Sequence, residues 1–320
     1  MLGKILRWIA VGLIVAVVFV SAAYLWDMNR AYDRIQGKST VIPSPYGDIE
    51  YTEGGSGPPV LVIHGSGGGY DQGELVVEAV LGDQFHWIAP SRFGYLRSTF
   101  NEGATFDDQA DAYAYLLDQL GVEKAAVVAI SHGGPSALLF AVLHPERVSS
   151  LTLISAGVAS IDAPDQAHAQ AQAHRQGEML VTIYRYDPLY WTITNLFKKQ
   201  FMELMGADET VIAELSPHQR EISEQIIDYM NPSSPRAAGA AFDNKAAMPN
   251  ERIATITAPT LIVHATDDTL QLYHNAQFAA ATIPGATLIS FDRGGHLLMI
   301  VEQPTIRTAV QKQILDQMSG

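Results

Sequence analysis

Short apolar runs that end at turn residues alternate along much of this chain with stretches of helical period. The runs expected to form buried strands cover residues 59–63, 85–89, 125–130, 148–155, 259–265 and 286–291. Residues 40–42 and 49–52 are separated by a turn rich in proline and glycine, so we expect an antiparallel pair at the edge of a sheet. Strands that alternate with helices predict an α/β fold with a mostly parallel sheet flanked by helices.

The alternation of strand and helix stops after Gly157. Residues 158–257 have helical composition and contain no strand-like run. We therefore expect one α/β core, formed by residues 40–157 and 258–320, that is interrupted by a helical insertion. Aromatic side chains are concentrated over residues 184–205. Most of them should fill the interior of the insertion, and the others should shape an apolar pocket.

The N-terminal segment has a pattern of its own. Residues 8–25 contain no charged side chain and are long enough to cross the hydrocarbon core of a membrane as a helix. A signal peptide would be cleaved near residues 21–23, which are small. Because the apolar character continues through Leu25, we favour an uncleaved anchor with Trp26 at the membrane interface.

Residues 1–39 are thus expected to comprise the transmembrane anchor, or the signal peptide, followed by a polar spacer over residues 27–39. A short leader of this kind usually leaves its N-terminus in the cytoplasm and exports the domain that follows. We therefore expect the main domain on the periplasmic or extracellular side of a lipid bilayer, or secreted if the leader is cleaved. Basic residues flank both ends of the apolar stretch, so these charges do not decide the orientation.

Composition narrows the range of partners and cofactors. The chain has 34 acidic and 20 basic residues, a formal net charge of −14, and no basic stripe that would bind phosphates, so nucleic acid is not an expected partner. Cysteine is absent, which excludes disulfides, thiolate nucleophiles and cysteine-ligated metals. We expect neither a metal nor an organic cofactor.

The candidate nucleophile lies where the apolar run 125–130 ends. Ser131 follows directly, and a helical pattern begins within a few residues. Ala129 and Gly133 stand two positions before and after it, which gives the pattern small-x-Ser-x-small. A serine on such a tight strand-to-helix turn has strained backbone angles, and bulky neighbours at those two positions would collide. The free N–H groups of the helix N-terminus beside it can receive an anion.

Three more loops that follow predicted strands carry candidate groups. Residues 64–69, His-Gly-Ser-Gly-Gly-Gly, form a glycine-rich loop, which is also found at phosphate sites, but no lysine follows as a P-loop requires. Asp267 and Asp268 follow the run that ends at Ala265, and a Gly-Gly-His sequence that ends at His296 follows the last strand.

These motifs together resemble the α/β-hydrolase superfamily. The likeness covers about residues 40–317, and an alanine replaces the first glycine of the superfamily's usual G-x-S-x-G turn. The chain order Ser131, Asp268, His296, each after a predicted strand, is the order of nucleophile, acid and base in this fold. The resemblance therefore implies a catalytic triad of these three side chains, with Asp267 as the alternative acid.

The same resemblance assigns an oxyanion hole and a lid. It implies that the backbone N–H groups of Ser66 and His132 hold the oxyanion of a tetrahedral intermediate. Arg92 and Arg97 belong to a turn that is similar to one in many members, and we expect them to clamp loops rather than bind substrate. The helical insertion over residues 158–257 takes the position of the superfamily's lid.

A serine at this turn indicates the function. Dehalogenases and epoxide hydrolases that resemble this fold use aspartate there, so we expect a serine hydrolase that cleaves carboxylic esters of small to medium apolar substrates through an acyl-enzyme. Proline aminopeptidases are the nearest rival, because acidic lid residues could hold a substrate amine; the candidates are Glu203, Asp208, Glu209 and Glu214. A carbon–carbon bond hydrolase and a slow-turnover ligand sensor are two further hypotheses.

Overall fold

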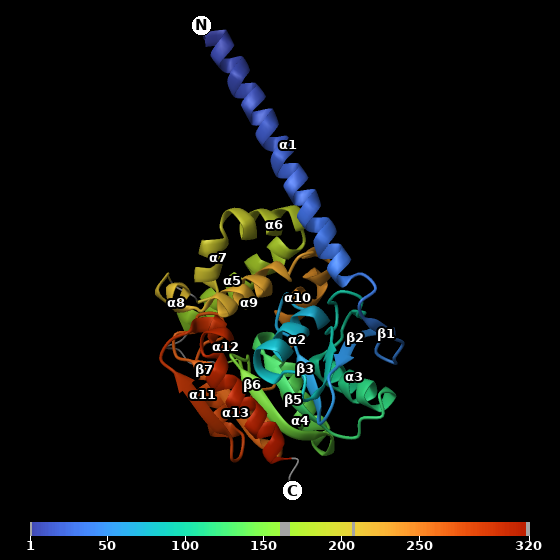
Figure 1. The fold of residues 1–320 in the computed structure, drawn as a ribbon. Helices are drawn as coiled ribbons and strands as arrows, with labels where there is room; N and C mark the ends of the chain where they lie inside the picture. Colours follow the sequence, from blue (N-terminus) through green and yellow to red (C-terminus); the bar gives the residue numbers. More distant parts are fainter. Residues whose placement is uncertain (1, 161–166, 207–208, 318–320) are drawn as a thin grey trace.

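The computed structural model describes residues 2–160, 167–206 and 209–317. Within these ranges, eight strands form one sheet in the order β1-β2-β4-β3-β5-β6-β7-β8 (Figure 1). The strands are β1 Thr40–Ile42, β2 Ile49–Gly54, β3 Pro59–Ile63, β4 His86–Pro90, β5 Ala125–Ile130, β6 Val148–Ile154, β7 Thr260–Ala265 and β8 Thr287–Phe291. Strand β2 pairs antiparallel with β1 and β4, and the other neighbours are parallel. The prediction of a mostly parallel sheet is confirmed.

The central strands β3 and β5 are apolar along their length because both faces of the sheet are covered there. Along β3, Val60 and Val62 contact one layer of the core, whereas Leu61 and Ile63 contact the other, and all four are fully buried. A strand buried in this way needs apolar side chains at every position, which explains the uninterrupted runs in the sequence. The predicted bounds of the strands differ from the observed ones by a residue or two, as for β4, which begins at His86.

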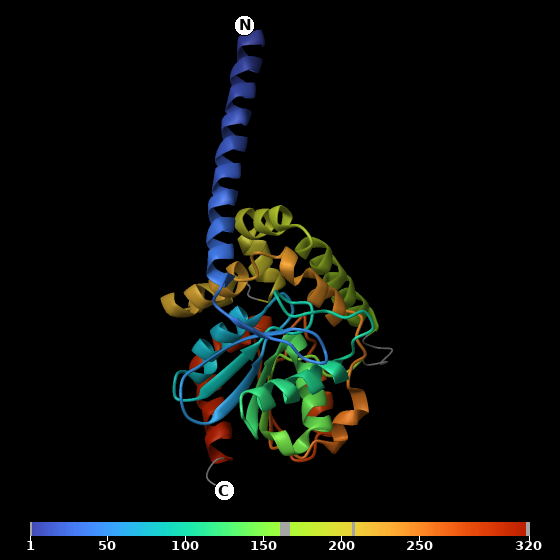
Figure 2. The same cartoon turned by 90° about the vertical axis from the view of Figure 1, so that its right-hand side faces the viewer.

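Helices form one layer on each face of the sheet. The first face is covered by α3 Phe106–Gln119, α4 Gly134–Leu143 and α11 His274–Thr282. The second face is covered by α2 Tyr70–Val76, α12 Leu298–Val301 and α13 Gln303–Asp316. The expected architecture, a mostly parallel sheet with helices on both faces, is therefore confirmed (Figure 2).

The expected insertion is helical in the residues that the structure describes, and residues 161–166 and 207–208 of it lie outside them. Its helices are α5 Ala167–Tyr184, α6 Asp187–Leu196, α7 Lys198–Leu204, α8 Glu209–Glu214, α9 Pro217–Asp228 and α10 Ala237–Asp243. They lie together on the side of the domain from which α1 projects (Figures 1 and 2). We call residues 158–257 the lid.

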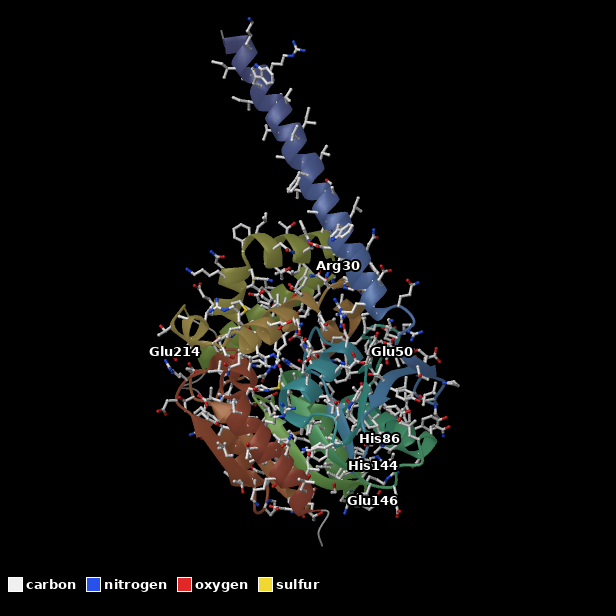
Figure 3. The ribbon with its side chains drawn as sticks, in the orientation of Figure 1. Arg30, Glu50, His86, His144, Glu146 and Glu214 are labelled. Carbon is white, nitrogen blue, oxygen red and sulfur yellow. The ribbon has the colours of Figure 1, made fainter. Side chains whose placement is uncertain are left out.

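Helix α1 spans Leu2–Ile35 without a break, and it is long and apolar enough to cross a membrane. Residues 27–35, the first part of the expected polar spacer, continue this helix. Met28 and Ala31 are buried one turn apart on the same side of the helix. These small apolar contacts dock the end of α1 against the lid, and Arg30 lies at this junction (Figure 3).

Candidate active site

Ser131 occupies the turn between β5 and α4. Its φ of 50° lies in the left-handed region, which is strained for a residue other than glycine. A Cβ on Gly133 would lie 2.7 Å from the carbonyl oxygens of both Ile63 and His64, so a larger residue does not fit there. The pattern small-x-Ser-x-small thus reflects the close approach of the end of β3 to the start of the helix.

Ser131, His296 and Asp268 form a chain of hydrogen bonds. Nε2 of His296 lies 2.9 Å from Oγ of Ser131, and Nδ1 of the same ring lies 2.9 Å from Oδ2 of Asp268. The three side chains come from the loops after β5, β8 and β7, at one edge of the sheet. In this arrangement a histidine can accept the serine proton while the carboxylate holds its ring in position.

The carboxylate of Asp268 is buried and held from several sides. Oδ1 accepts hydrogen bonds of 2.9 Å from the N–H groups of Leu270 and Gln271. Burial by itself raises the pKa of Asp268, but His296, these hydrogen bonds and His264 outweigh it, so the pKa lies below its ordinary value. Asp268 is therefore ionised at neutral pH. His264, a buried residue of β7, lies 3.6 Å from Oδ2 of this carboxylate.

Asp267, the alternative acid, supports the same site in a different way. Its carboxylate accepts the backbone N–H of Gly295 at 2.9 Å and that of Gly294 at 3.3 Å. These glycines directly precede His296. Asp267 therefore fixes the backbone of the histidine loop, whereas Asp268 contacts the imidazole ring.

The histidine loop also touches the lid through its backbone. The N–H of His296 donates to the carbonyl oxygen of Met205 at 3.0 Å. Gly295 has a φ of 53°, and a Cβ there would lie 2.4 Å from the carbonyl oxygen of Gly206. The Gly-Gly-His sequence is thus explained by a close approach of two backbones, a contact that the sequence pattern does not reveal.

Ser66 and His132 both border the cavity at Ser131. The loop that contains Ser66 approaches closely, since a Cβ on Gly65 would lie 2.9 Å from Cβ of Ser131. His132 is the second residue of the helical segment that starts at Ser131, where backbone N–H groups have no acceptor within the helix. Burial lowers the pKa of the His132 imidazole, so its ring is neutral at neutral pH.

The glycine-rich loop is braced by a buried ion pair that sequence reasoning missed. Arg236 of the lid forms hydrogen bonds of 2.9 and 2.7 Å to the carboxylate of Asp71, and both side chains are buried. The same guanidinium donates to the carbonyl oxygen of Gly68 at 2.7 Å. Arg34 at the end of α1 also contacts Asp71, at 3.3 Å. The loop, the lid and α1 therefore meet at one carboxylate.

A second buried ion pair connects the core to the lid. Arg92 donates to both oxygens of Asp243, at 2.5 and 2.8 Å, and neither side chain is exposed. The hydroxyl of Tyr95 donates to the same carboxylate and lies 3.2 Å from Oγ of Ser66. Burial and the nearby Asp243 raise the pKa of Tyr95, which keeps the hydroxyl protonated. Arg92 thus clamps a loop, as expected, but its partner on the lid was not foreseen. Arg97 also clamps its loop as expected, through an ion pair with Glu50 of β2.

Two cavities meet at Ser131. The larger, about 380 Å³, has a mixed lining to which the lid contributes Leu180, Tyr184, Asp243 and Met248, among others. The smaller, about 50 Å³, is mostly apolar, and its wall includes Ile154, Ile226, Met299 and Ile300. Ser66, Ser131 and His296 border both. A substrate at Ser131 thus has a roomy side and a narrow apolar side.

The acidic lid residues proposed for an aminopeptidase do not line these cavities where the structure describes them. Glu203 pairs with Lys199, and Glu214 lies at the outer edge of the lid, where it pairs with Arg293 (Figure 3). Asp208 and the side chain of Glu209 lie outside what the structure describes. In the part of the lid that is described, the carboxylate that borders the larger cavity is that of Asp243.

Comparisons with known proteins agree with this architecture. A family model described as alpha/beta hydrolase fold matches residues 58–303. The uncharacterized hydrolase YcgS of Bacillus subtilis (strain 168) is 30% identical over 264 residues, which cover 79% of this chain and 90% of that protein. The 2-hydroxy-6-oxo-6-phenylhexa-2,4-dienoate hydrolase of Comamonas testosteroni is 26% identical over 260 residues, covering 78% of this chain and 84% of that protein.

A solved structure has a similar arrangement of helices and strands. The alpha/beta hydrolase fold protein from Nakamurella multipartita superposes on this chain with a TM-score of 0.69 at 27% sequence identity. The superposition covers 88% of this chain and 100% of that one.

Proposed function

Because the chain belongs to the α/β-hydrolase family, we propose that this hydrolase cleaves uncharged carboxylic esters of small to medium size through an acyl-enzyme. The observation that carries the proposal is the chain of hydrogen bonds from Ser131 through His296 to Asp268, both of 2.9 Å. It gives a neutral serine hydroxyl the base it needs to attack a carbonyl carbon at neutral pH.

In the proposed reaction, His296 takes the proton of Ser131 as the oxygen attacks, and Asp268 stabilises the imidazolium that forms. The backbone N–H groups of Ser66 and His132 hold the oxyanion, and each such donor typically contributes about 3 kcal/mol to the transition state. The imidazolium then gives its proton to the leaving alcohol. A water molecule, deprotonated by the same histidine, attacks the acyl-enzyme and releases the acid.

The charge in the cavities supports an uncharged substrate. No lysine or arginine from the described residues lines either cavity. Asp243 borders the larger one, but Arg92 pairs with its carboxylate through two hydrogen bonds. A substrate carboxylate would thus meet no unpaired cation, and a substrate amine would meet a carboxylate that is already neutralised. This argues against an aminopeptidase, whose substrates carry a free amine.

A carbon–carbon bond hydrolase is the second candidate, and the relative from Comamonas testosteroni favours it. The substrate that the name of that relative states is a dienoate and therefore carries a carboxylate. The lack of a lysine or arginine among the described lining residues speaks against such a substrate here. The small apolar cavity instead suits a short alkyl or acyl group on one side of an ester.

Two assays test the proposal. The purified protein should react with a fluorophosphonate probe and hydrolyse p-nitrophenyl butyrate in sustained turnover, and Ser131→Ala should abolish both. A single stoichiometric burst without turnover would indicate a slow sensor instead. Faster cleavage of proline p-nitroanilide, or of a carbon–carbon bond in a dienoate, than of any ester would overturn the ester assignment.

We also propose that α1 is retained as a membrane anchor, with the main domain on the periplasmic or extracellular side. Support comes from the continuity of α1, which runs without a break from the apolar stretch into turns that dock on the lid. There Trp191 donates to the carboxylate of Asp27 at 2.9 Å, and Arg34 donates to the carbonyl oxygen of Asn231. Mass spectrometry of the membrane-extracted protein should find residues 1–23 intact. A reporter that is active only outside the cytoplasm, fused after Lys38, should be active, and a silent reporter would reverse the orientation.

A further inference from the structure

One side of α6 in the lid is an exposed apolar surface. Tyr186, Leu189, Leu196 and Phe197, which we call the α6 surface, are 60%, 42%, 63% and 53% exposed. Leu189 and Leu196 are seven positions apart and so lie on the same side of the helix, and Tyr186 and Phe197 flank its two ends. Outside α1 and this surface, no large apolar side chain among the described residues is more than 47% exposed. The concentration of such side chains on one element therefore calls for a partner.

The α6 surface lies at the level along α1 where its apolar stretch ends. The ring of Trp191, in the middle of α6, contacts the ring of Tyr24 edge-on, with centroids 5.5 Å apart. The indole N–H of Trp191 donates to Asp27, less than one helical turn further along α1. Figures 1 and 2 agree that α6 lies beside α1 and that the sheet lies further away.

The length of the apolar stretch sets where a membrane would end. At 1.5 Å per residue, residues 8–25 span roughly 27 Å, close to the thickness of the hydrocarbon core of a bilayer. Figure 3 shows that this part of α1 extends beyond the domain and that its side chains surround the helix on all sides. Tyr24, Trp26 and Asp27 then lie in the interfacial layer, and the contact with Trp191 holds α6 at the same depth.

Charge around the α6 surface is also that of a membrane-facing helix. Residues 184–201 contain three basic side chains and one acidic one, in a chain with a net charge of −14. The acid, Asp187, accepts hydrogen bonds from the N–H and hydroxyl of Ser234 within the lid. The bases are Arg185, Lys198 and Lys199, and the two lysines also form exposed pairs with lid carboxylates. Apolar side chains flanked by basic ones favour the surface of an anionic bilayer.

We propose that the α6 surface is a second membrane contact, in which Leu189, Leu196 and Phe197 enter the interfacial layer of the bilayer that α1 crosses. The inference rests on the proposed anchor, and it goes beyond it because it assigns a membrane-binding role to the lid. Since α6 begins three residues after Tyr184, which lines the larger cavity, the element that contacts the membrane is continuous with a wall of the active site.

The absence of cysteine allows a direct test with single-cysteine variants of the full chain. Leu196→Cys carries the probe, labelled with an environment-sensitive fluorophore, in vesicles of phosphatidylcholine and phosphatidylglycerol. Leu143→Cys is the matched control, because Leu143 is 38% exposed and adjoins His144, which lies at the opposite end of the domain (Figure 3). Val15→Cys reports whether α1 is in the bilayer.

The expected result is a blue-shifted emission at position 196 that lipid-attached quenchers suppress, as at position 15, while the label at position 143 remains accessible to water-soluble quenchers. Adding Leu196→Asp to a labelled Leu189→Cys variant should weaken the lipid quenching at position 189 without changing the hydrolysis of a soluble ester. That last measurement shows that the variant is folded.

Three outcomes would overturn the inference. If the label at position 196 is as accessible to water as that at position 143, while position 15 is in lipid, the anchor stands and the lid contact does not. If position 15 is also in water, the anchor and the contact both fail. Protection at position 196 that requires two copies in one nanodisc would identify a second copy of this chain, rather than lipid, as the partner.

Discussion

Asp267 and Asp268 are adjacent in the sequence, but their carboxylates hold different parts of the same loop. Asp268 lies 2.9 Å from Nδ1 of the His296 ring, whereas Asp267 accepts the backbone N–H of Gly295 at 2.9 Å. One carboxylate therefore orients the imidazole, and the other fixes the backbone that carries it. This difference leads to a clear ranking of their effects on catalysis.

Asp268→Asn should lower kcat by about 10⁴-fold, the loss observed when the acid of a Ser-His-Asp triad is replaced by its amide. The amide no longer stabilises the imidazolium and favours the wrong tautomer of His296. Asp267→Asn is the matched control, and we expect a much smaller loss, because the amide oxygen can still accept the N–H of Gly295 and only the longer bond from Gly294 is lost. Initial rates with p-nitrophenyl butyrate measure both, and the reverse ranking would reassign the acid to Asp267.

Asp243→Asn should destabilise the protein strongly. It leaves the buried guanidinium of Arg92 without its carboxylate, and breaking a buried pair in this way typically costs about 3–5 kcal/mol. Asp107→Asn removes one partner of an exposed pair with Arg252, which has the same two-bond geometry, and should cost at most about 1 kcal/mol.

The free energy of unfolding of both variants, measured with denaturant in detergent, checks this difference. Equal losses in the two variants would mean that the Arg92–Asp243 pair contributes no more than an exposed one. In that case the connection between core and lid would depend on apolar contacts alone.

The two cavities predict a dependence of the rate on chain length. Met299→Ala enlarges the small cavity, so esters with a longer chain on one side of the carbonyl should gain in kcat/KM relative to short ones. Met248→Ala is the control, because Met248 lines the larger cavity and its truncation should leave that preference unchanged. The test uses two series of p-nitrophenyl and alkyl esters, varied on the acyl side and on the alcohol side. A change of chain-length preference in both series, or in neither, would contradict the assignment of the small cavity to one side of the ester carbonyl.

Stability should fall as the pH is lowered below about 6.5, the ordinary pKa of histidine. Burial and the adjacent charge of Arg92 lower the pKa of His64 well below that value, so the folded state keeps this ring neutral while the unfolded chain takes up a proton. Such a group contributes a slope of up to about 1.4 kcal/mol per pH unit in this window.

His64→Gln should reduce the slope of the unfolding free energy between pH 7.5 and pH 5.5, and His218→Gln, at an exposed position, should leave it as it is. The measurement is a series of denaturant titrations at several pH values. An unchanged slope in His64→Gln would mean that other groups produce the acid sensitivity.

The sequence by itself determined the strands, the helical lid and the positions of Ser131 and His296. These features are local: a strand buried on both faces requires an apolar run, and residues that follow parallel strands gather at one edge of the sheet. The turn at Ser131 could also be predicted locally, because the small residues that its tight geometry requires stand two positions before and after the serine.

Only the tertiary structure decided which side chains meet across the chain. It showed that Asp268, and not Asp267, contacts the His296 ring, because the side chains of adjacent loop residues point in different directions. It also paired Arg92 with Asp243, which are 151 positions apart, and docked the end of α1 on the lid where the sequence indicated a spacer. Polar partners of this kind follow no period along the sequence, because their contacts depend on how distant segments pack together.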